Sequence, residues 1–348
     1  MSTDIHFEIK GNAGVVTLDK QETLNAVTAD MLRMLDQHLD VWEQNDQVSR
    51  IIIKASPGRA FSAGGDIRHL YERGMAKDYD FDFFAHEYQL NARIASFTKP
   101  YIAIIDGIAM GGGVGVSYHG SHVVAGDNHM FAMPEVGIGF FPDVGGSYIL
   151  SRLPGKLGLY LGMTGDRVRQ GDAVLSGLAD YAVASDRIGD LVDALCISKD
   201  INATLDGFAT NVEQGVHMAN LDLINEAFSG QSVMEIVECL TTMSESDGGR
   251  ADWATKVLQQ IRQKSPTSLE IAFRQISNGA DLSMDDCMRM EYRILRRILP
   301  ERDFYEGIRA AIIDKDNAPK WVPDALTNVD PAHIDRYFRE LGHEELQL

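Results

Sequence analysis

The stretches Ala63-Gly64-Gly65-Asp66 and Met110-Gly111-Gly112-Gly113 each follow a short continuous apolar run, Ile51–Ile53 in the first case and Tyr101–Ile105 in the second. Apolar runs of this length are typical of strands that are buried on both faces. We expect a helix to begin just after each glycine bend, at Ile67 in the first case. Strand, bend and helix therefore recur as a unit, which predicts an α/β fold.

The two glycine bends are followed in the sequence by two acids. Glycine reaches positive φ angles and lets the backbone approach a ligand closely, so both bends can aim backbone N–H groups at one point, as in an oxyanion hole. Glu135 follows Pro134, and Asp143 follows Pro142. Each acid can serve as the acid, base or nucleophile that a polarised carbonyl requires. The pattern predicts acyl chemistry on a carbonyl compound.

These segments resemble the enoyl-CoA hydratase/isomerase (crotonase) superfamily, and most closely its thioester-cleaving branch, the 3-hydroxyisobutyryl-CoA hydrolases. A typical hydratase has a glutamate two residues after the third glycine of the triple-glycine bend, where this chain has Gly115. The hydrolase branch instead pairs the glutamate of Met-Pro-Glu with the aspartate of Phe-Pro-Asp-Val-Gly-Gly, and both are present as Glu135 and Asp143. The resemblance covers nearly the whole chain and includes Glu87–Asn91, Ser265–Ser268, Asp303–Arg309, Asp314–Asp316 and Pro319–Trp321.

The resemblance implies a crotonase-like spiral of strand–strand–helix units with a helical C-terminal region. It assigns residues 1–190 to the spiral core with the active site, and residues 191–348 to a mainly helical region that packs on the core. Apolar periodicity independently predicts a series of amphipathic helices in the second half of the chain. These helices are expected at residues 188–198, 221–228, 233–243, 253–263 and 267–276.

Near the N-terminus, residues 5–9 and 15–18 flank a glycine-containing turn and predict a β-hairpin. A helix with Thr28 as its cap is expected next. Its apolar face would consist of Met31, Leu32, Leu35, Leu39 and Trp42.

The resemblance implies hydrolysis of 3-hydroxyisobutyryl-CoA, or of a related short 3-hydroxyacyl-CoA thioester, to the hydroxy acid and free coenzyme A in valine breakdown. Gly65 and Gly112 match the oxyanion donors of the superfamily, and Ala63, Gly64, Gly112 and Glu87 are expected to bind substrate. No cofactor is implied beyond the coenzyme A of the substrate. The superfamily often forms homo-oligomers.

In the same resemblance, Glu135 attacks the carbonyl as a nucleophile or activates water as a base. Asp143 orients the substrate hydroxyl or the water and can protonate the leaving thiolate. The residues themselves leave other interpretations open. Asp143 can cap a helix that begins at Val144, and Asp66 can cap the helix that begins at Ile67. The apolar neighbours of Glu135 favour a buried carboxylate, which is often catalytic.

Two other functions remain as alternatives. An enoyl-CoA hydratase or isomerase has the same fold, and isomerases can work with one glutamate. A noncatalytic acyl-CoA-binding protein is the alternative from another class, although loss of both acids would then be expected. The triple glycine is not a dinucleotide fingerprint, because the third glycine and the following acid of that motif are missing.

Charge and cysteine content indicate which classes of binding partner and which cellular compartment to expect. The net charge of −19 disfavours nucleic acid and anionic membranes as partners. The three cysteines have no paired short spacing, so neither a disulfide framework nor a metal site is expected. The cysteine content fits a reducing compartment. Together with the lack of a recognisable presequence in residues 1–9, it predicts a cytoplasmic location. Basic candidates for the coenzyme A phosphates are Lys20, Lys54, Arg59 and Arg68.

Overall fold

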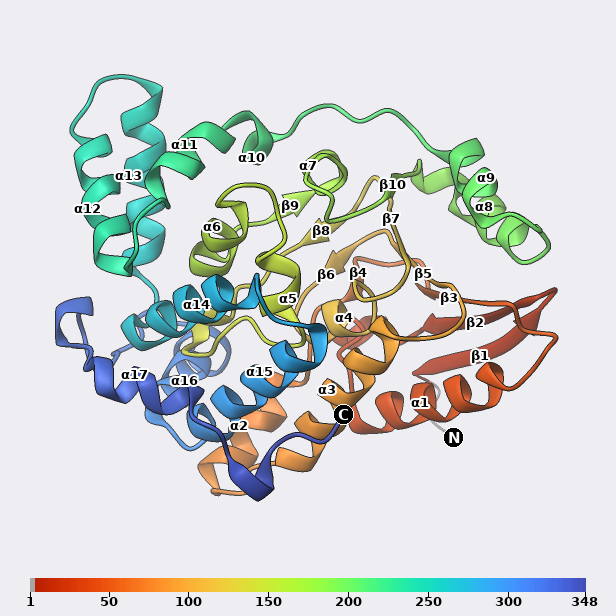
Figure 1. Ribbon diagram of the computed structural model, residues 1–348, viewed down its shortest axis with the longest axis horizontal. Helices are drawn as coiled ribbons and strands as arrows, with labels where there is room; N and C mark the ends of the chain where they lie inside the picture. The colour runs from red at the N-terminus through yellow and green to blue at the C-terminus, as the bar shows by residue number, and fades with distance from the viewer. Residues whose placement is uncertain (1–3) are drawn as a thin grey trace. The chain divides into compact units, whose positions relative to one another are not determined.

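The computed structural model describes residues 4–348, and its elements are labelled in Figure 1. Residues 1–3, on which part of the expectation about a presequence depends, lie outside the described range. The chain forms two compact units, each assembled from separate stretches of sequence. Unit 1 contains residues up to 66, 86–132 and 167–218, and unit 2 contains residues 67–85, 133–166 and 219–348.

Unit 1 contains a six-stranded sheet with the strand order β1-β2-β3-β5-β7-β10. The first two strands are antiparallel, and the other neighbours are parallel. The two continuous apolar runs predicted as buried strands form β3 and β5 in the middle of this sheet, as expected. The strands are β1 (Ile5–Lys10), β2 (Ala13–Leu18), β3 (Arg50–Ala55), β5 (Tyr101–Ile105), β7 (His122–Ala125) and β10 (Tyr181–Ala182).

The predicted hairpin and the helix that follows it are both confirmed. Strands β1 and β2 pair from Ile5 opposite Leu18 to Lys10 opposite Ala13. Helix α1 (Ala29–Glu43) begins after Thr28, whose side chain accepts a hydrogen bond from the backbone N–H of Met31. All five apolar residues assigned to the inner face of this helix are buried.

A second, four-stranded sheet in unit 1 has the order β4-β6-β8-β9. Strands β4 and β6 pair in parallel and each leads into one of the glycine bends, so the two bends leave the same edge of this sheet. Helices begin after the bends, as predicted. The elements are β4 (Ala60–Ser62), β6 (Ile108–Ala109), β8 (Met130–Phe131), β9 (Val168–Arg169), α2 (Ile67–Met75) and α4 (Gly112–Gly115).

The core of unit 1 lies between the main sheet and two helices near residue 200. Side chains of β2, β3, β5 and β7 pack with Leu191, Leu195 and Leu205 of those helices. The remaining helices that begin in unit 1 are η1 (Gln21–Thr23), α7 (Gln170–Leu175), η3 (Ser185–Arg187), α8 (Ile188–Leu195), α9 (Ile201–Phe208) and α10 (Val216–Ala219). The division between the two units falls within α3 (Phe81–Ala95).

Unit 2 is helical (Figure 1), and the amphipathic helices predicted for the second half of the chain are present. It includes α2, described above, and continues with η2 (Glu135–Ile138), α5 (Gly146–Leu150), α6 (Leu157–Thr164), α11 (Leu221–Ala227), α12 (Val233–Ser244) and α13 (Gly249–Arg262). They are followed by α14 (Pro266–Gly279), α15 (Met284–Ile298), α16 (Arg302–Ile308), η4 (Arg309–Ile313), η5 (Leu326–Asn328), α17 (Pro331–Phe338) and η6 (Gly342–Glu344). Every residue of α6 is buried.

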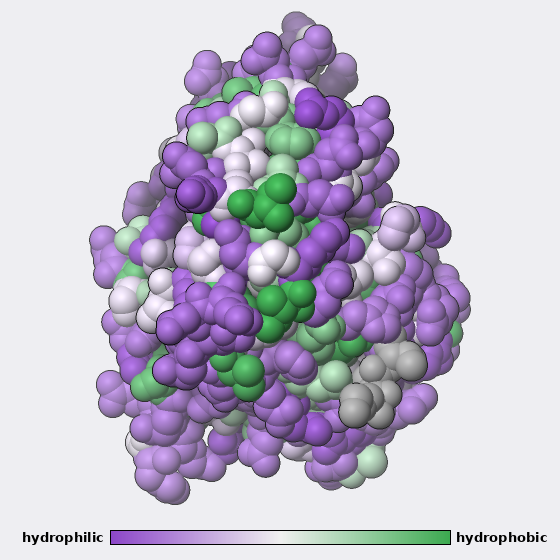
Figure 2. Space-filling view, turned by 90° about the vertical axis from the view of Figure 1, so that its right-hand side faces the viewer, coloured by the Kyte–Doolittle hydropathy of each residue, from purple (hydrophilic) through white to green (hydrophobic). Residues whose placement is uncertain are grey.

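The surface drawn in Figure 2 is mostly hydrophilic, with hydrophobic residues scattered over it. Among residues 4–348, no helix is both long and apolar enough to cross a membrane. The same residues contain no cluster of three or more His, Cys, Asp or Glu side chains that could hold a metal ion.

Candidate active site

The two glycine bends of unit 1 are in contact with each other. Gly64 has a φ of 106° and Gly111 a φ of 46°, and both values favour glycine. A Cβ atom on Gly64 would lie 3.4 Å from the carbonyl oxygen of Met110. The N–H of Met110 donates to the carbonyl oxygen of Ser62 over 3.0 Å. Positive φ values and backbone pairing therefore bring two segments together that lie nearly fifty residues apart in the sequence.

Each bend presents at least one backbone N–H that makes no hydrogen bond to any residue in the described range. Such N–H groups belong to Gly65 in the first bend and to Gly111 and Gly112 in the second. Of these, Gly65 and Gly112 are the oxyanion donors predicted from the sequence. By contrast, the N–H of Ala63 donates to the carbonyl oxygen of Leu24 over 2.9 Å. A Cβ atom on Gly65 would meet no atom within 4 Å, so the space beside this residue is open. Two unsatisfied donors on adjacent bends are what binding of an oxyanion requires.

Helix α3 places two buried polar side chains against the short glycine helix α4. A Cβ atom on Gly112 would lie 2.7 Å from Oε1 of Glu87, and one on Gly115 would lie 2.7 Å from Nδ2 of Asn91. Asn91 is fully buried, and its amide has no hydrogen-bond partner within the described part of the chain. Asn91 therefore fills the space into which a hydratase-type glutamate at position 115 would have to project.

Unit 2 holds the two acids singled out in the sequence. Glu135 is the first residue of η2 and is buried, with only 7% of its surface exposed. Its Oε2 atom has no hydrogen-bond partner among residues 4–348. Burial, followed by the nearby carboxyl group of Asp143, raises the pKa of Glu135 well above its usual range. A buried carboxyl group with a free oxygen and a raised pKa is typical of a catalytic acid or base.

The short turn that carries Glu135 is packed tightly against helix α16. Gly139 follows this turn with a φ of 71°, and a Cβ atom there would lie 2.3 Å from the carbonyl oxygen of Asp303. On the other side of the contact, a Cβ atom on Gly307 would lie 2.3 Å from the carbonyl carbon of Ile138. Backbone therefore lies directly on backbone, which fixes the position of η2.

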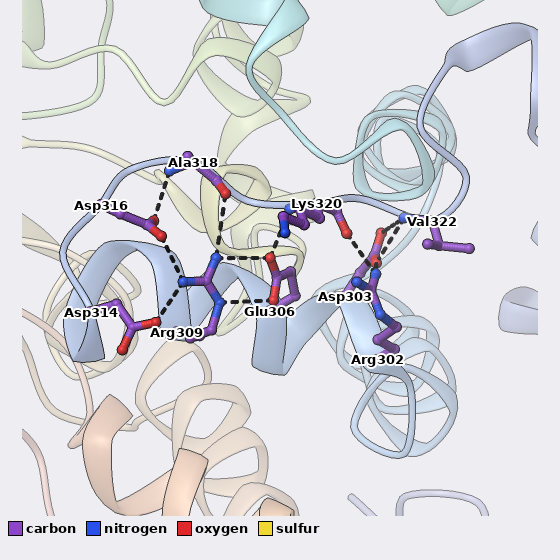
Figure 3. Close-up of polar contacts among 9 residues, drawn as sticks. All are labelled: Arg302, Asp303, Glu306, Arg309, Asp314, Asp316, Ala318, Lys320 and Val322. Atoms are coloured by element: carbon purple, nitrogen blue, oxygen red, sulfur yellow. Dashed lines mark hydrogen bonds and ion pairs between the residues drawn. The ribbon is translucent and has the colours of Figure 1, made fainter.

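Figure 3 shows how helix α16 is tied to the segment that follows it. Arg309 donates to both carboxyl oxygens of Glu306, at 2.9 and 3.0 Å, and also contacts Asp314 and Asp316. The backbone N–H of Lys320 donates to Glu306 over 2.8 Å. The C-terminal motifs that carried the family resemblance thus form one polar cluster in unit 2.

The structure corrects the expectation that Asp143 caps a helix beginning at Val144. Helix α5 begins at Gly146, and its N-cap residue is Gly145. Val144 has a φ of 50°, so the chain makes a left-handed turn before the helix can start. The paired glycines at 145 and 146 permit this turn. Asp143 is buried, and its carbonyl oxygen accepts a hydrogen bond from the N–H of Gly146 over 2.8 Å.

A third buried carboxyl group, Glu291 on α15, was not identified from the sequence. Its oxygens accept hydrogen bonds from the N–H groups of Gly145 (2.8 Å) and Ser147 (2.9 Å) and from the Ser147 hydroxyl. Burial raises the pKa of Glu291 to about 8, although these hydrogen bonds oppose the shift. One signal was available, because position 291 lies on the apolar face of α15 with Cys287, Leu295 and Ile298.

The basic candidates for the coenzyme A phosphates differ in their surroundings. Lys20 forms an ion pair with Asp4 over 2.9 Å, and Arg68 donates to the carbonyl oxygen of Ile312 over 3.4 Å. Lys54 lines a cavity of about 550 Å³ in unit 1. The structure therefore does not single out one of them as a phosphate-binding group.

The raised carboxyl pKa values predict how stability depends on pH. The pKa of Glu291 rises from 4.5 to about 8 on folding, so its contribution is complete below pH 4.5 and is lost as the pH rises to about 8. Glu135 acts in the same direction. His129, whose burial lowers its pKa from 6.5 to about 4, has the opposite effect, but only below pH 6.5. The free energy of unfolding should therefore fall on the order of 1–2 kcal/mol between pH 6.5 and 8 through Glu291 alone.

Urea denaturation at a series of pH values measures this dependence. In the Glu291→Gln variant, position 291 no longer titrates, and the slope above pH 6.5 should become smaller. An unchanged slope in that variant would contradict the assignment.

A family model and solved structures of known proteins match this chain over nearly its whole length. The family model described as enoyl-CoA hydratase/isomerase matches residues 13–338. A carnitinyl-CoA dehydratase from Mycobacterium thermoresistibile is similar in structure, with a TM-score of 0.92, 35% identity and 99% of both chains covered. An enoyl-CoA hydratase from Rhodobacter sphaeroides 2.4.1 has a TM-score of 0.91 at 35% identity, covering 99% of this chain and 100% of that one. The crotonase-type architecture predicted from the sequence is confirmed.

Curated relatives are similar over almost the whole chain. The mitochondrial 3-hydroxyisobutyryl-CoA hydrolase of Xenopus tropicalis is 45% identical, covering 97% of this chain and 89% of that protein. The human protein of the same name is 40% identical, covering 99% and 91%. The expected cytoplasmic location is wrong on this comparison, since these relatives are named as mitochondrial. Cysteine usage separates reducing from oxidising compartments and does not separate one reducing compartment from another.

Proposed function

Because the chain belongs to the enoyl-CoA hydratase/isomerase family, we propose that it hydrolyses 3-hydroxyisobutyryl-CoA, the thioester in the name of its curated relatives. Water cleaves the bond between the carbonyl carbon and sulfur, releasing the 3-hydroxy acid and free coenzyme A. These products fit a step in valine breakdown. The reaction needs no cofactor beyond the coenzyme A of the substrate. We also propose that copies of the chain associate with one another, as the family resemblance implies.

One observation favours a hydrolase over the hydratases and dehydratases named among the similar structures. A hydratase of this family is expected to use a second acid at position 115, and the side chain of Asn91 occupies that space. The acid pair of the hydrolase branch is retained in unit 2 as Glu135 and Asp143, both buried. Retention of buried acids also argues against a noncatalytic binding protein, because a buried carboxyl group is costly without a role.

The unsatisfied donors of unit 1 supply the electrostatic part of the proposed mechanism. The N–H groups of Gly65 and Gly112 donate to the thioester oxygen, which gains negative charge as the carbonyl carbon is attacked. Donors fixed in the backbone need no reorganisation during the reaction, and each one contributes to the rate on the order of a hundredfold. The bends that carry them are rigid because Met110 is hydrogen-bonded to Ser62.

The acids of unit 2 supply the covalent and proton-transfer steps. In its ionised form, Glu135 either attacks the carbonyl carbon to give a mixed anhydride, which water then cleaves, or removes a proton from the attacking water. Asp143 binds the 3-hydroxyl group of the substrate or the water. In its protonated form, Asp143 can donate its carboxyl proton to the departing thiolate. We propose that Glu87, together with Ala63 and Gly64, contacts the bound thioester.

Release of free thiol from a panel of acyl-CoA thioesters tests this proposal. With 3-hydroxyisobutyryl-CoA as reference, kcat/KM for isobutyryl-CoA should be lower by about a hundredfold or more, because a buried Asp143 would be left without its hydroxyl partner. The Asp143→Asn variant should lose much of this discrimination and keep some cleavage. The alternative activity is monitored in parallel as loss of the conjugated enoyl absorbance with an enoyl-CoA substrate.

Each alternative gives a distinct result in this panel. Equal turnover of both thioesters would contradict the role of Asp143. Loss of enoyl absorbance without thiol release would favour a hydratase. Tight binding of the thioesters with neither signal would favour an acyl-CoA-binding protein.

A further inference from the structure

The turn between Asp143 and helix α5 is strained. Val144 has a φ of 50°, which is unusual for a branched side chain, and Gly145 continues the turn with a φ of 85°. Such a conformation persists only where the surrounding structure holds it in place. The residue immediately before the strained position is Asp143, so whatever holds the turn also holds the backbone of Asp143.

Two buried side chains from different helices hold this turn. On one side of Asp143, the Gln275 side chain of α14 donates to the carbonyl oxygen of Pro142. On the other side, the Glu291 carboxyl group of α15 accepts hydrogen bonds from the N–H groups of Gly145 and Ser147 and from the Ser147 hydroxyl. Both Gln275 and Glu291 are fully buried.

The contact with Glu291 is unlike an ordinary core contact. A carboxylate can accept three hydrogen bonds from one turn, whereas an apolar residue would leave two backbone N–H groups buried without acceptors. The carboxyl groups of Asp143 and Glu135 also lie within electrostatic range of Glu291. Placing a third acid beside two others is unfavourable, and the three hydrogen bonds from the turn offset this cost.

We propose that Glu291 is a positioning residue, whose carboxyl group holds the strained turn at Val144 and thereby sets Asp143 for recognition of the 3-hydroxyl group. This inference rests on the proposed function. It concerns selectivity for the substrate rather than the basal ability to cleave a thioester. Glu291 is hydrogen-bonded to the turn and has no step of its own in the proposed mechanism.

The experiment compares kcat/KM for 3-hydroxyisobutyryl-CoA and isobutyryl-CoA in the full chain. Glu291→Gln replaces one acceptor oxygen by an NH₂ group that faces backbone donors, so at least one hydrogen bond of the turn is lost. The ratio of the two kcat/KM values should fall by about tenfold or more. Ile294→Ala, which removes a fully buried side chain from the same helix, is the matched control for loss of packing. This control should lower stability and leave the ratio unchanged.

A second substitution separates positioning from general damage. Val144→Gly removes the strain, because glycine adopts a φ near 50° without cost. In that background, Glu291→Gln should change the substrate ratio much less than it does in the natural chain. If Glu291→Gln does not fold, Glu291→Asp, which keeps the carboxyl group and withdraws it by one methylene, is tested in both backgrounds with the same expectation.

The outcomes distinguish this inference from the proposed function. No thiol release by the natural chain would overturn the proposed function itself. Thiol release with an unchanged ratio in the Glu291 variants would overturn the positioning role alone. One further outcome is that the ratio of the two kcat/KM values falls equally with and without Val144→Gly, and another is that it falls by the same factor in Ile294→Ala. Either result would show that Glu291 acts only through general stability.

Discussion

Replacing Glu135 by glutamine is expected to lower the rate constant of thioester cleavage by roughly a thousandfold or more, while binding of the thioester persists. The amide keeps the size of the side chain and its hydrogen bonding, but it is neither a nucleophile nor a base. Thiol release measures the rate, and calorimetric titration with a thioester measures the binding. Because the reactive form is ionised and the pKa of Glu135 is raised, the rate of the natural enzyme should increase with pH until this group is ionised.

Glu270→Gln is the matched control for this substitution. Glu270 is another glutamate of unit 2 whose pKa is raised by burial, and it has no part in the proposed chemistry. Its amide variant should cleave the thioester at nearly the natural rate. Full activity in a folded Glu135→Gln protein would overturn the assignment of this residue.

Isotope labelling can identify Glu135 as a nucleophile, although label in the product acid alone fits both roles, because water can also attack the substrate carbonyl of a mixed anhydride. In a single turnover in water enriched in heavy oxygen, attack by Glu135 followed by hydrolysis at its own carbonyl leaves the label in the protein. Mass spectrometry of the peptide that contains Glu135 detects this label. A general base places the label only in the product acid, so labelled peptide is evidence for the nucleophile.

Gly65→Pro is expected to lower the cleavage rate by about a hundredfold or more, because proline has no N–H to donate to the thioester oxygen. Gly65→Ala is a stringent control. It keeps the N–H, and the added Cβ atom meets no protein atom within 4 Å, so its rate should fall much less than that of the proline variant. Circular dichroism verifies the fold of both variants. A folded proline variant with the natural turnover would show that Gly65 is not an oxyanion donor.

Local patterns in the sequence were sufficient to predict several of the elements, whereas the short strands of the second sheet and the long helix α15 were not predicted. The apolar runs became the central strands of the main sheet, and the hairpin, the Thr28 cap and the later helices appeared where periodicity placed them. These features depend on residues close together in the chain, where hydrophobic spacing and capping act directly. The helix start at Val144 was wrong because paired glycines permitted a left-handed turn that a cap signal does not reveal.

The candidate site was only partly accessible from the sequence. Glycine bends and acids beside prolines are local signals, and they supplied Gly65, Gly112, Glu135 and Asp143. Glu291 was missed, and Asn91 was noted only as part of the motif Glu87–Asn91, because their importance comes from contacts with residues far away in the chain, at 145–147 and at 115. In the local sequence, each is a polar residue on a buried helix face. The role of such a residue becomes clear only when the element that packs against it is known.

The packing of Asn91 against Gly115 also limits how this protein can change its reaction by mutation. A Gly115→Glu substitution would bring its Cβ atom to 2.7 Å from Nδ2 of Asn91, so the Asn91 side chain would have to move before a second acid could be accommodated. Shortening residue 91 would open that space and would also remove a buried amide that has no hydrogen-bond partner in the described part of the chain. The effect of a change at position 115 therefore depends on the residue at position 91, which makes the two positions epistatic.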